Sequence, residues 1–329
     1  MILNNWLSLD RGDQIDVFTQ TGAETGLPPF AVEKDAWVTL MLRMLFASEL
    51  SEHIVFKGGT SLSKVYGLID RLSEDIDLAI DRSYLGFTGE LSKGDIRRLR
   101  RASHDFSLKE MPDILHAQLE AYRIDQDLYK IEVPNTKVSD QDPEIIFINY
   151  KSLFEEESYL PDWVQVEIGA RSLNELFSTS SIDSILDETF DESSFSEEPF
   201  EVKSIIPEKT FLEKIILLHE EFQKPAEKIR THRMSRHLYD IFSIHNTESG
   251  KSALKDIELF RAICNHRAVF TPIKGVDYDA LNLADLNILP TGDFVDLYKA
   301  DYQAMRGNMI YGNPPEFEEI IEVVGSILK

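Results

Sequence analysis

The sequence has almost no cysteine and no long hydrophobic run. Its 329 residues include one cysteine, Cys264, which excludes a disulfide within the chain and a cysteine-rich zinc site. No apolar stretch reaches the roughly 18 residues that a membrane-spanning helix needs. The first residues also lack the basic and apolar segments of a secretory signal. We therefore expect a soluble protein of the cytoplasm, without a membrane partner.

Positive charge is also scarce. The chain has 34 lysines and arginines against 58 aspartates and glutamates, which gives a net charge of −24. This balance argues against a protein that coats DNA, because that class depends on many cationic contacts with phosphates. It does not exclude a local basic site on an acidic body. Hydrophobic residues make up 43% of the chain, which is enough to bury a core and argues against global disorder.

The length and the hydrophobic pattern indicate an α+β protein with two domains, at residues 1–200 and 201–329. The acidic, serine-rich segment 183–201 is expected to be a loop at the boundary. The chain after Pro207 has a mostly helical pattern. In the first half, strands are predicted at 53–56, 75–81, 129–133, 144–150 and 164–170, with helices at 34–50, 60–68 and 93–122.

The strongest local pattern is Gly58-Gly59-Thr60 followed by Asp75-Ile76-Asp77. A glycine pair before a helix lets backbone N–H groups approach a phosphate closely. Two aspartates that are two positions apart on a strand project to the same face, and their like charges favour a divalent cation between them. Mg²⁺ suits one or two carboxylates together with substrate phosphates. A phosphate loop and a carboxylate pair are what metal-assisted nucleotidyl transfer requires.

A third acid could complete this group. Glu167 lies in the predicted strand 164–170, on the face opposite to Val166 and Ile168. It could serve as a metal ligand or as a base for an incoming hydroxyl. It could equally be an ordinary glutamate on the surface of a strand, and the spacing does not decide between these interpretations.

Four segments of the chain resemble a known family. KGGTSLSKVYG and RLSEDIDLAI are similar to the nucleotidyltransferase superfamily signature, and more narrowly to AbiEii/AbiGii-type toxin nucleotidyltransferases of abortive-infection and type IV toxin–antitoxin systems. PEKTFLEKIILLHE and RTHRMSRHLYDIFSI resemble that family's lysine helix and Arg-x-x-Tyr-Asp helix. The resemblance implies a polymerase-β-like mixed sheet with flanking helices. It also implies a helical C-terminal domain that completes the active-site cleft.

The resemblance assigns an expected role to each matching residue. The residues expected to bind the nucleotide are Gly58, Gly59, Thr60, Ser73 and Arg236, and Lys64, one turn into the predicted helix, is a further candidate. The residues expected at the catalytic centre are Asp75, Asp77, Lys214 and Asp240, of which Asp75 and Asp77 would hold Mg²⁺, with Mn²⁺ as a possible substitute. Glu167 joins them through its place in the strand pattern and not through the resemblance. The substrate would be an NTP.

Two of these roles have plain structural alternatives. Lys214 is flanked by apolar residues, which is typical of a lysine at the edge of a core whose ammonium reaches out to solvent. Asp240 could pair with Arg236 or Arg233 and have a purely structural role.

By resemblance, the acceptor would be RNA, such as a tRNA 3′ end, and a cognate antitoxin would be encoded next to this protein. Basic runs at 93–101 and 228–237 could form a positive groove for RNA. The candidate contacts are Arg97, Arg98, Arg101, Arg230 and Arg233. Two other functions compete with this prediction. One is nucleotidyl transfer to a small cationic molecule, which an acidic cleft would suit, and the other is nucleotide binding without catalysis.

Overall fold

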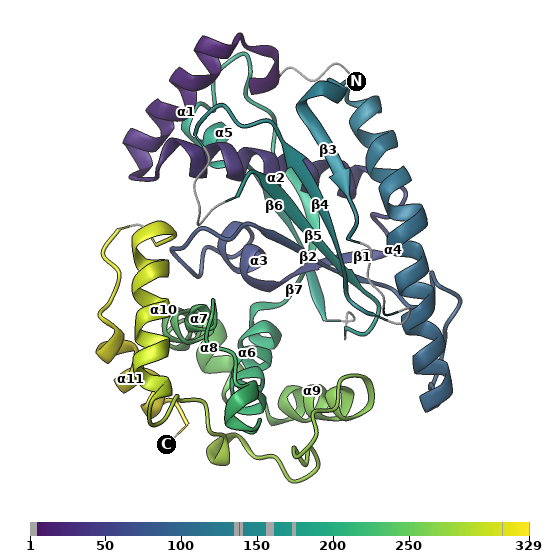
Figure 1. Cartoon of the computed structure of the whole chain (residues 1–329), viewed down its shortest axis with the longest axis vertical. Helices are drawn as coiled ribbons and strands as arrows, with labels where there is room; N and C mark the ends of the chain where they lie inside the picture. The colour runs from purple at the N-terminus through teal and green to yellow at the C-terminus, as the bar shows by residue number, and fades with distance from the viewer. Residues whose placement is uncertain are drawn as a thin grey trace. The chain divides into compact units, whose positions relative to one another are not determined.

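The computed structural model describes residues 5–134, 138, 141–155, 161–172, 176–310 and 312–328. A seven-stranded sheet runs in the order β3-β4-β5-β2-β1-β7-β6 (Figure 1). The strands are β1 (Ile54–Lys57), β2 (Asp75–Ile80), β3 (Tyr129–Glu132), β4 (Glu144–Tyr150), β5 (Trp163–Gly169), β6 (Phe177–Ile182) and β7 (Phe200–Ile205). The α-helices are α1 (Arg11–Thr25), α2 (Pro29–Ala47), α3 (Gly58–Lys64), α4 (Lys93–Ala121), α5 (Ile185–Thr189), α6 (Pro207–Phe222), α7 (Ser235–His245), α8 (Glu248–Ala253), α9 (Ile257–Phe270), α10 (Phe294–Asn308) and α11 (Phe317–Ser326).

The sheet is mixed, as the sequence predicts. Strand β2 runs parallel to β5 and antiparallel to β1, while β4 is antiparallel to both β3 and β5. Helix α2 packs against β2 and β5, and α4 packs against β4 and α2. The predicted α+β class, with helices that flank a mixed sheet and a helical C-terminal region, is therefore confirmed. In the described part of the chain, none of the helices is both long and apolar enough to cross a membrane.

The chain divides into two compact units that do not follow a single cut in the sequence. Unit 1 comprises residues 1–65 and 72–204 and holds the sheet, while unit 2 comprises residues 66–71 and 205–329 and holds α6 to α11. The short segment 66–71 leaves unit 1 between α3 and β2 and belongs to unit 2. Nothing in its composition signals this exchange, because the sequence pattern reports local periodicity and not tertiary contact.

Two local predictions are wrong, and one strand was not predicted. Helix α3 ends at Lys64 instead of residue 68, and Gly67, with a φ of +58°, follows soon after its end. Segment 183–201 is not an open loop, because it contains α5, whose first turn is capped by the side chain of Ser184 and holds a buried Asp187. Strand β6 has no predicted counterpart, because it lies at the edge of the sheet, where alternate residues are exposed, and its sequence shows no hydrophobic alternation.

Helix α2 carries three consecutive buried charges, Glu33, Lys34 and Asp35, none of which is more than 4% exposed. The carboxylate of Glu33 accepts hydrogen bonds from Ser152 Oγ at 2.7 Å and from the backbone N–H of Leu153 at 3.0 Å. Burial raises the pKa of Glu33 to about 7, although both hydrogen bonds act in the opposite direction. Desolvation therefore dominates at this position.

The junction between β1 and α3 requires glycine at position 58. Gly58 has a φ of +82°, which side chains rarely adopt, and a Cβ atom there would lie 2.0 Å from Oδ2 of Asp77. The register of β1 and β2, which pairs Lys57 with Asp77, brings this backbone next to the carboxylate. Gly58 therefore permits both the left-handed turn and the close approach.

We predict that Gly58→Ala destabilises the protein more than Gly86→Ala. Both glycines have nearly equal φ, +82° and +83°, but a Cβ at Gly86 meets nothing within 4 Å. The left-handed conformation costs about 1–2 kcal/mol in each variant, and only Gly58→Ala also displaces Asp77. Thermal melting of the two variants checks this. An equal fall in melting temperature would show that the collision between the new Cβ and Asp77 is relieved at no cost.

We also predict that Glu33→Gln stabilises the protein increasingly as the pH rises. The pKa of Glu33 is about 7 in the native state against 4.5 ordinarily. The native state thus binds the proton more tightly, and the stability that this proton contributes is lost as the pH rises from below 4.5 through 7. Melting of variant and wild type should differ more near pH 8 than near pH 5. A difference that stays constant with pH would contradict the prediction.

Candidate active site

Three acidic side chains lie on one face of two neighbouring strands. In the parallel register of β2 and β5, Asp77 is paired with Glu167, and Asp75 lies two residues earlier on the same face. All three are half-buried, whereas the residues that alternate with them, such as Ile76 and Val166, are fully buried. Neighbouring strands are about 4.8 Å apart, so Asp77 and Glu167 lie side by side. Their charges repel each other unless a cation or a proton intervenes.

The donor set of Asp75 and Asp77 fits a Mg²⁺ ion. Carboxylate oxygens are the hard ligands that Mg²⁺ prefers, and proteins commonly supply one or two of them while substrate phosphates and water complete the octahedron. Two carboxylates leave most coordination positions of Mg²⁺ to phosphate oxygens and water, so this donor set suits a metal that is bound jointly with a phosphate-containing substrate.

The hydroxyl groups near the glycine pair form hydrogen bonds with other groups of the protein. Thr60 is buried, and its Oγ1 hydrogen-bonds with Ser73 Oγ at 2.8 Å and with the backbone carbonyl of Asp75. Ser61 Oγ donates to the backbone carbonyl of Gly58 at 3.0 Å. The sequence suggests that these hydroxyls bind phosphate. The structure instead uses Thr60 to join α3 to the start of β2.

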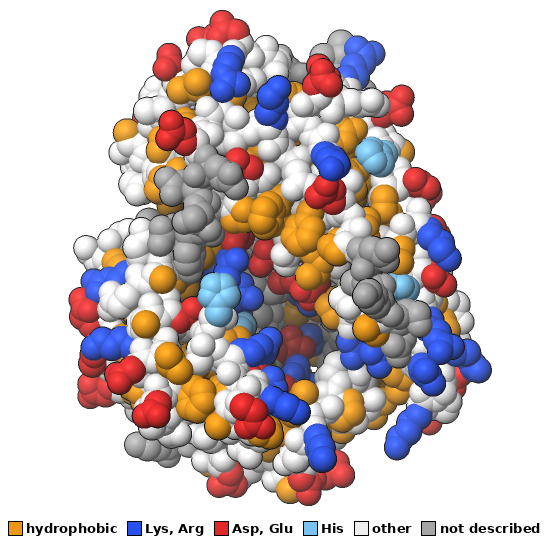
Figure 2. Space-filling view, viewed as in Figure 1, with side chains coloured by type: hydrophobic (Ala, Val, Ile, Leu, Met, Phe, Trp, Pro, Cys, Tyr) orange, Lys and Arg blue, Asp and Glu red, His pale blue; other side chains and the backbone are white. Residues whose placement is uncertain are grey.

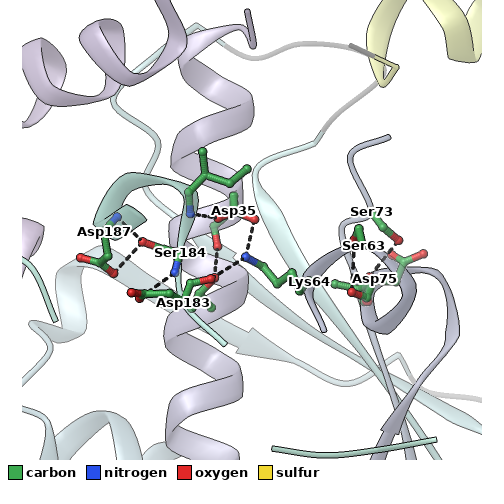
Figure 3. A network of polar contacts seen from close by, with 11 residues as sticks. Asp35, Ser63, Lys64, Ser73, Asp75, Asp183, Ser184 and Asp187 are labelled. Atoms are coloured by element: carbon green, nitrogen blue, oxygen red, sulfur yellow. Dashed lines mark hydrogen bonds and ion pairs between the residues drawn. The ribbon is translucent and has the colours of Figure 1, made fainter. Parts of the chain in front are cut away.

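Lys64 also has an internal partner. Its ammonium lies 2.6 Å from Oδ1 of Asp35, and both side chains are nearly fully buried. It also donates a hydrogen bond to the backbone carbonyl of Asp183 at 3.3 Å. Figure 3 shows that Lys64 points toward α2 and α5, while Ser73 and Asp75 lie near its backbone end. These contacts favour a structural role for Lys64 over the predicted contact with a nucleotide.

Unit 2 contains a buried ion cluster around Asp240. Arg71 binds the carboxylate through two hydrogen bonds, from Nε to Oδ1 at 2.7 Å and from Nη2 to Oδ2 at 2.9 Å. Lys214 Nζ lies 2.8 Å from Oδ2. The side chain of Asp240 is completely buried, and that of Lys214 is only 9% exposed, so its ammonium does not reach out to solvent. The alternative of a lysine at the edge of the core is therefore wrong.

The cluster keeps Asp240 ionised. Burial by itself would raise the pKa of Asp240, but Arg71 and Lys214 outweigh burial and hold this pKa well below its ordinary value. Burial lowers the pKa of Lys214, and the carboxylate of Asp240 partly offsets this effect. The sequence points to Arg236 or Arg233 as partners of Asp240 and misses Arg71. Arg71 lies in the RLSED segment that precedes Asp75, but nothing local in the sequence links it to Asp240.

The candidate RNA contacts belong to both units. Arg97, Arg98 and Arg101 are exposed on α4, and Figure 2 shows basic side chains over the lower end of this helix. Arg98 pairs with Asp95 in the first turn of α4. In unit 2, the guanidinium of Arg230 is held by Glu221, and the backbone N–H of Arg233 donates to Asp301. The exposed arginines among these candidates are thus the three on α4 and Arg230, which is 59% exposed.

Comparison with known proteins identifies relatives. The family model described as nucleotidyl transferase AbiEii toxin, type IV toxin–antitoxin system, matches residues 39–323. Among solved structures, MenT4, a nucleotidyltransferase toxin from Mycobacterium tuberculosis H37Rv, is similar with a TM-score of 0.55 and 12% identity, covering 98% of this chain and 90% of that chain. JHP933 from Helicobacter pylori has a TM-score of 0.39 and 14% identity, covering 92% and 100%. No curated protein sequence matches the chain.

The likeness to MenT4 concerns the fold and agrees with the predicted polymerase-β-like architecture. The family match includes the glycine pair, both aspartates of β2, Lys214 and Asp240. Because this match spans most of the chain, the protein belongs to the AbiEii family and is a nucleotidyltransferase of the type IV toxin–antitoxin class.

Proposed function

We propose that this enzyme transfers a nucleoside monophosphate from an NTP to an acceptor hydroxyl, with pyrophosphate as the leaving group. The observation that carries the proposal is the placement of Asp75, Asp77 and Glu167 on one sheet face, with the backbone of Gly58 directly against Asp77. This arrangement brings a loop that can approach phosphate next to carboxylates that can hold a metal. Positioning and electrostatic stabilisation are the main contributions that phosphoryl transfer needs.

The residues of unit 1 have distinct roles in this proposal. Asp75 and Asp77 hold Mg²⁺, or Mn²⁺ in its place, and the ion supplies charge that neutralises the triphosphate. Backbone N–H groups at Gly58 and Gly59 contact phosphate oxygens, and Thr60 keeps Ser73 and the start of β2 beside them.

Glu167 is the better candidate for the base that takes the acceptor's proton. Asp240 is saturated by Arg71 and Lys214, and its pKa lies well below the ordinary value, so it binds a proton poorly. We assign Asp240 the task of holding Lys214 in its charged form. Lys214 and Arg236 then stabilise negative charge on the phosphates as the leaving group departs.

We expect Asp77→Asn to abolish nucleotide incorporation and leave the fold intact, because the change removes a metal ligand and relieves repulsion with Glu167. Asp81→Asn is the matched control, since Asp81 follows the last residue of β2 and caps a turn through Ser83. Incorporation of labelled NTP with Mg²⁺, measured beside thermal melting, checks both variants. Normal incorporation by Asp77→Asn would refute the site. Wild-type binding of NTP without incorporation would favour the non-catalytic alternative.

We further propose that the acceptor is RNA, with a tRNA 3′ end as the expected case, and that a cognate antitoxin is encoded next to this protein. The support is a local one. Arg97, Arg98 and Arg101 lie exposed on α4 of a chain with a net charge of −24. Basic side chains that remain exposed on an acidic protein are suited to the RNA backbone. Membership of a toxin–antitoxin family supports growth arrest of the cell as the result of this activity.

We expect the triple change Arg97→Glu, Arg98→Glu and Arg101→Glu to weaken RNA binding steeply and to leave NTP binding unchanged. Each phosphate contact that is lost should reduce the salt dependence of binding by about one unit of slope. Lys109→Glu, farther along the same helix and exposed, is the control for a general effect of charge. Binding titrations at several salt concentrations provide the measurement. Unchanged RNA affinity at low salt would favour transfer to a small molecule.

A further inference from the structure

Lys34 of α2 contacts the beginnings of both strands that carry the acidic residues. Its ammonium lies 3.0 Å from Oε2 of Glu74 and donates to the backbone carbonyls of Pro161 and Trp163, each at 2.6 Å. Glu74 directly precedes Asp75 on β2, and Trp163 is the first residue of β5. Lys34 is 1% exposed, so these contacts replace the hydration of its charge. One ammonium thus joins the two strands ahead of the carboxylates.

Asp35, the next residue of α2, contacts the helix that follows the glycine pair. Its Oδ1 lies 2.6 Å from Lys64, the last residue of α3, and its Oδ2 accepts a hydrogen bond from the backbone N–H of Ile185 at 2.9 Å. In Figure 3, Asp35 lies between Lys64 on one side and the backbone of α5 on the other. Asp35 is 4% exposed. It therefore holds the end of α3, seven residues long, whose first residues are Gly58 and Gly59.

Stability alone is a weak explanation for these buried pairs. Replacement of a buried ion pair by well-packed apolar residues is often neutral or stabilising, because the ions lose their hydration on burial. Adjacent residues of an α-helix point about 100° apart, since the helix has 3.6 residues per turn. Lys34 and Asp35 can therefore reach two different elements from one rigid helix. Apolar side chains could contact the same two elements but could not hold them in a unique geometry.

We propose that Lys34 and Asp35 are positioning residues that set the two halves of the active site relative to each other. Lys34 places the strands that carry Asp75, Asp77 and Glu167, and Asp35 places the helix that carries the glycine loop. Neither side chain touches the substrate. This inference rests on the proposed function, because it assumes that the carboxylates hold the metal and that the loop holds phosphate.

The two residues should have separable effects. Lys34→Met should raise the Mg²⁺ concentration needed for half-maximal incorporation and lower kcat by about 100-fold, the loss expected from a displacement of about 1 Å. Asp35→Asn should raise the KM for NTP about tenfold or more and leave the Mg²⁺ requirement near that of the wild type. Lys64→Met should have the same effect as Asp35→Asn, and the double variant should be no worse than either single one.

Glu33→Gln is the matched control, because Glu33 is the adjacent buried charge of the same helix and accepts hydrogen bonds from the loop at Ser152 and Leu153, away from β2 and α3. It should change neither the Mg²⁺ requirement nor the KM. If Lys34→Met does not fold, the test uses Glu74→Gln instead, because Lys34 then still donates hydrogen bonds to the backbone carbonyls of Pro161 and Trp163. Glu74→Gln should raise the Mg²⁺ requirement in the same direction.

A binding measurement without turnover separates the two proposals. Mn²⁺ binding in the presence of saturating inorganic tripolyphosphate, followed by electron paramagnetic resonance, should be weakened by Lys34→Met but not by Asp35→Asn or Glu33→Gln. The tripolyphosphate concentration that half-saturates this binding should rise in Asp35→Asn. Folded Lys34→Met and Asp35→Asn variants that match Glu33→Gln in binding and in kinetics would overturn the positioning role. A wild type that neither incorporates nucleotide nor binds Mn²⁺ with tripolyphosphate would overturn the proposed function itself.

Discussion

The burial of three consecutive charges in α2 is the constraint on which unit 1 depends. Glu33, Lys34 and Asp35 each lose their hydration in the folded state, and an unpaired buried charge costs several kcal/mol. Their partners come from the loop after β4, from the starts of β2 and β5, and from the end of α3. Helix α2 can therefore pack favourably only when all of these elements are in place. The same contacts that make the fold cooperative also determine the geometry of the candidate site.

A second buried ion cluster organises unit 2 by the same principle. Asp240 of α7 binds Arg71 through two hydrogen bonds and Lys214 of α6 through one ion pair, and the two cations keep it ionised in spite of its burial. Arg71 lies at the end of the segment 66–71, after which the chain returns to unit 1 and continues to Asp75. The RLSED segment thus serves both units, because its arginine belongs to one and its acids to the other.

Most of the lysines near the motifs already neutralise carboxylates. Lys34 pairs with Glu74, Lys64 with Asp35 and Lys214 with Asp240. In a chain with a net charge of −24, these cations hold the fold together before any substrate binds. Under the proposed function, the divalent ion adds positive charge beside Asp75 and Asp77, where Lys57 is the register partner of Asp77. This agrees with a site whose own side chains supply oxygen ligands.

The sequence by itself determined the α+β class, the helical second half and the shared face of Asp75 and Asp77, because alternation on a strand gives the face of each side chain. The mixed sheet and the family were implied by the resemblance of its motifs, and the family model that matches residues 39–323 confirms the family. The pairing of β2 with β5 decided that Glu167 shares the face of the two aspartates. Only the tertiary structure decided the partners of the charges. Arg71 is far from Asp240 in sequence, as Lys34 is from Pro161, and no local pattern reports such pairs. The sequence predicts nucleotide contacts for Thr60 and Lys64 for the same reason, because only the packed chain shows that Thr60 hydrogen-bonds with Ser73 and that Lys64 pairs with Asp35.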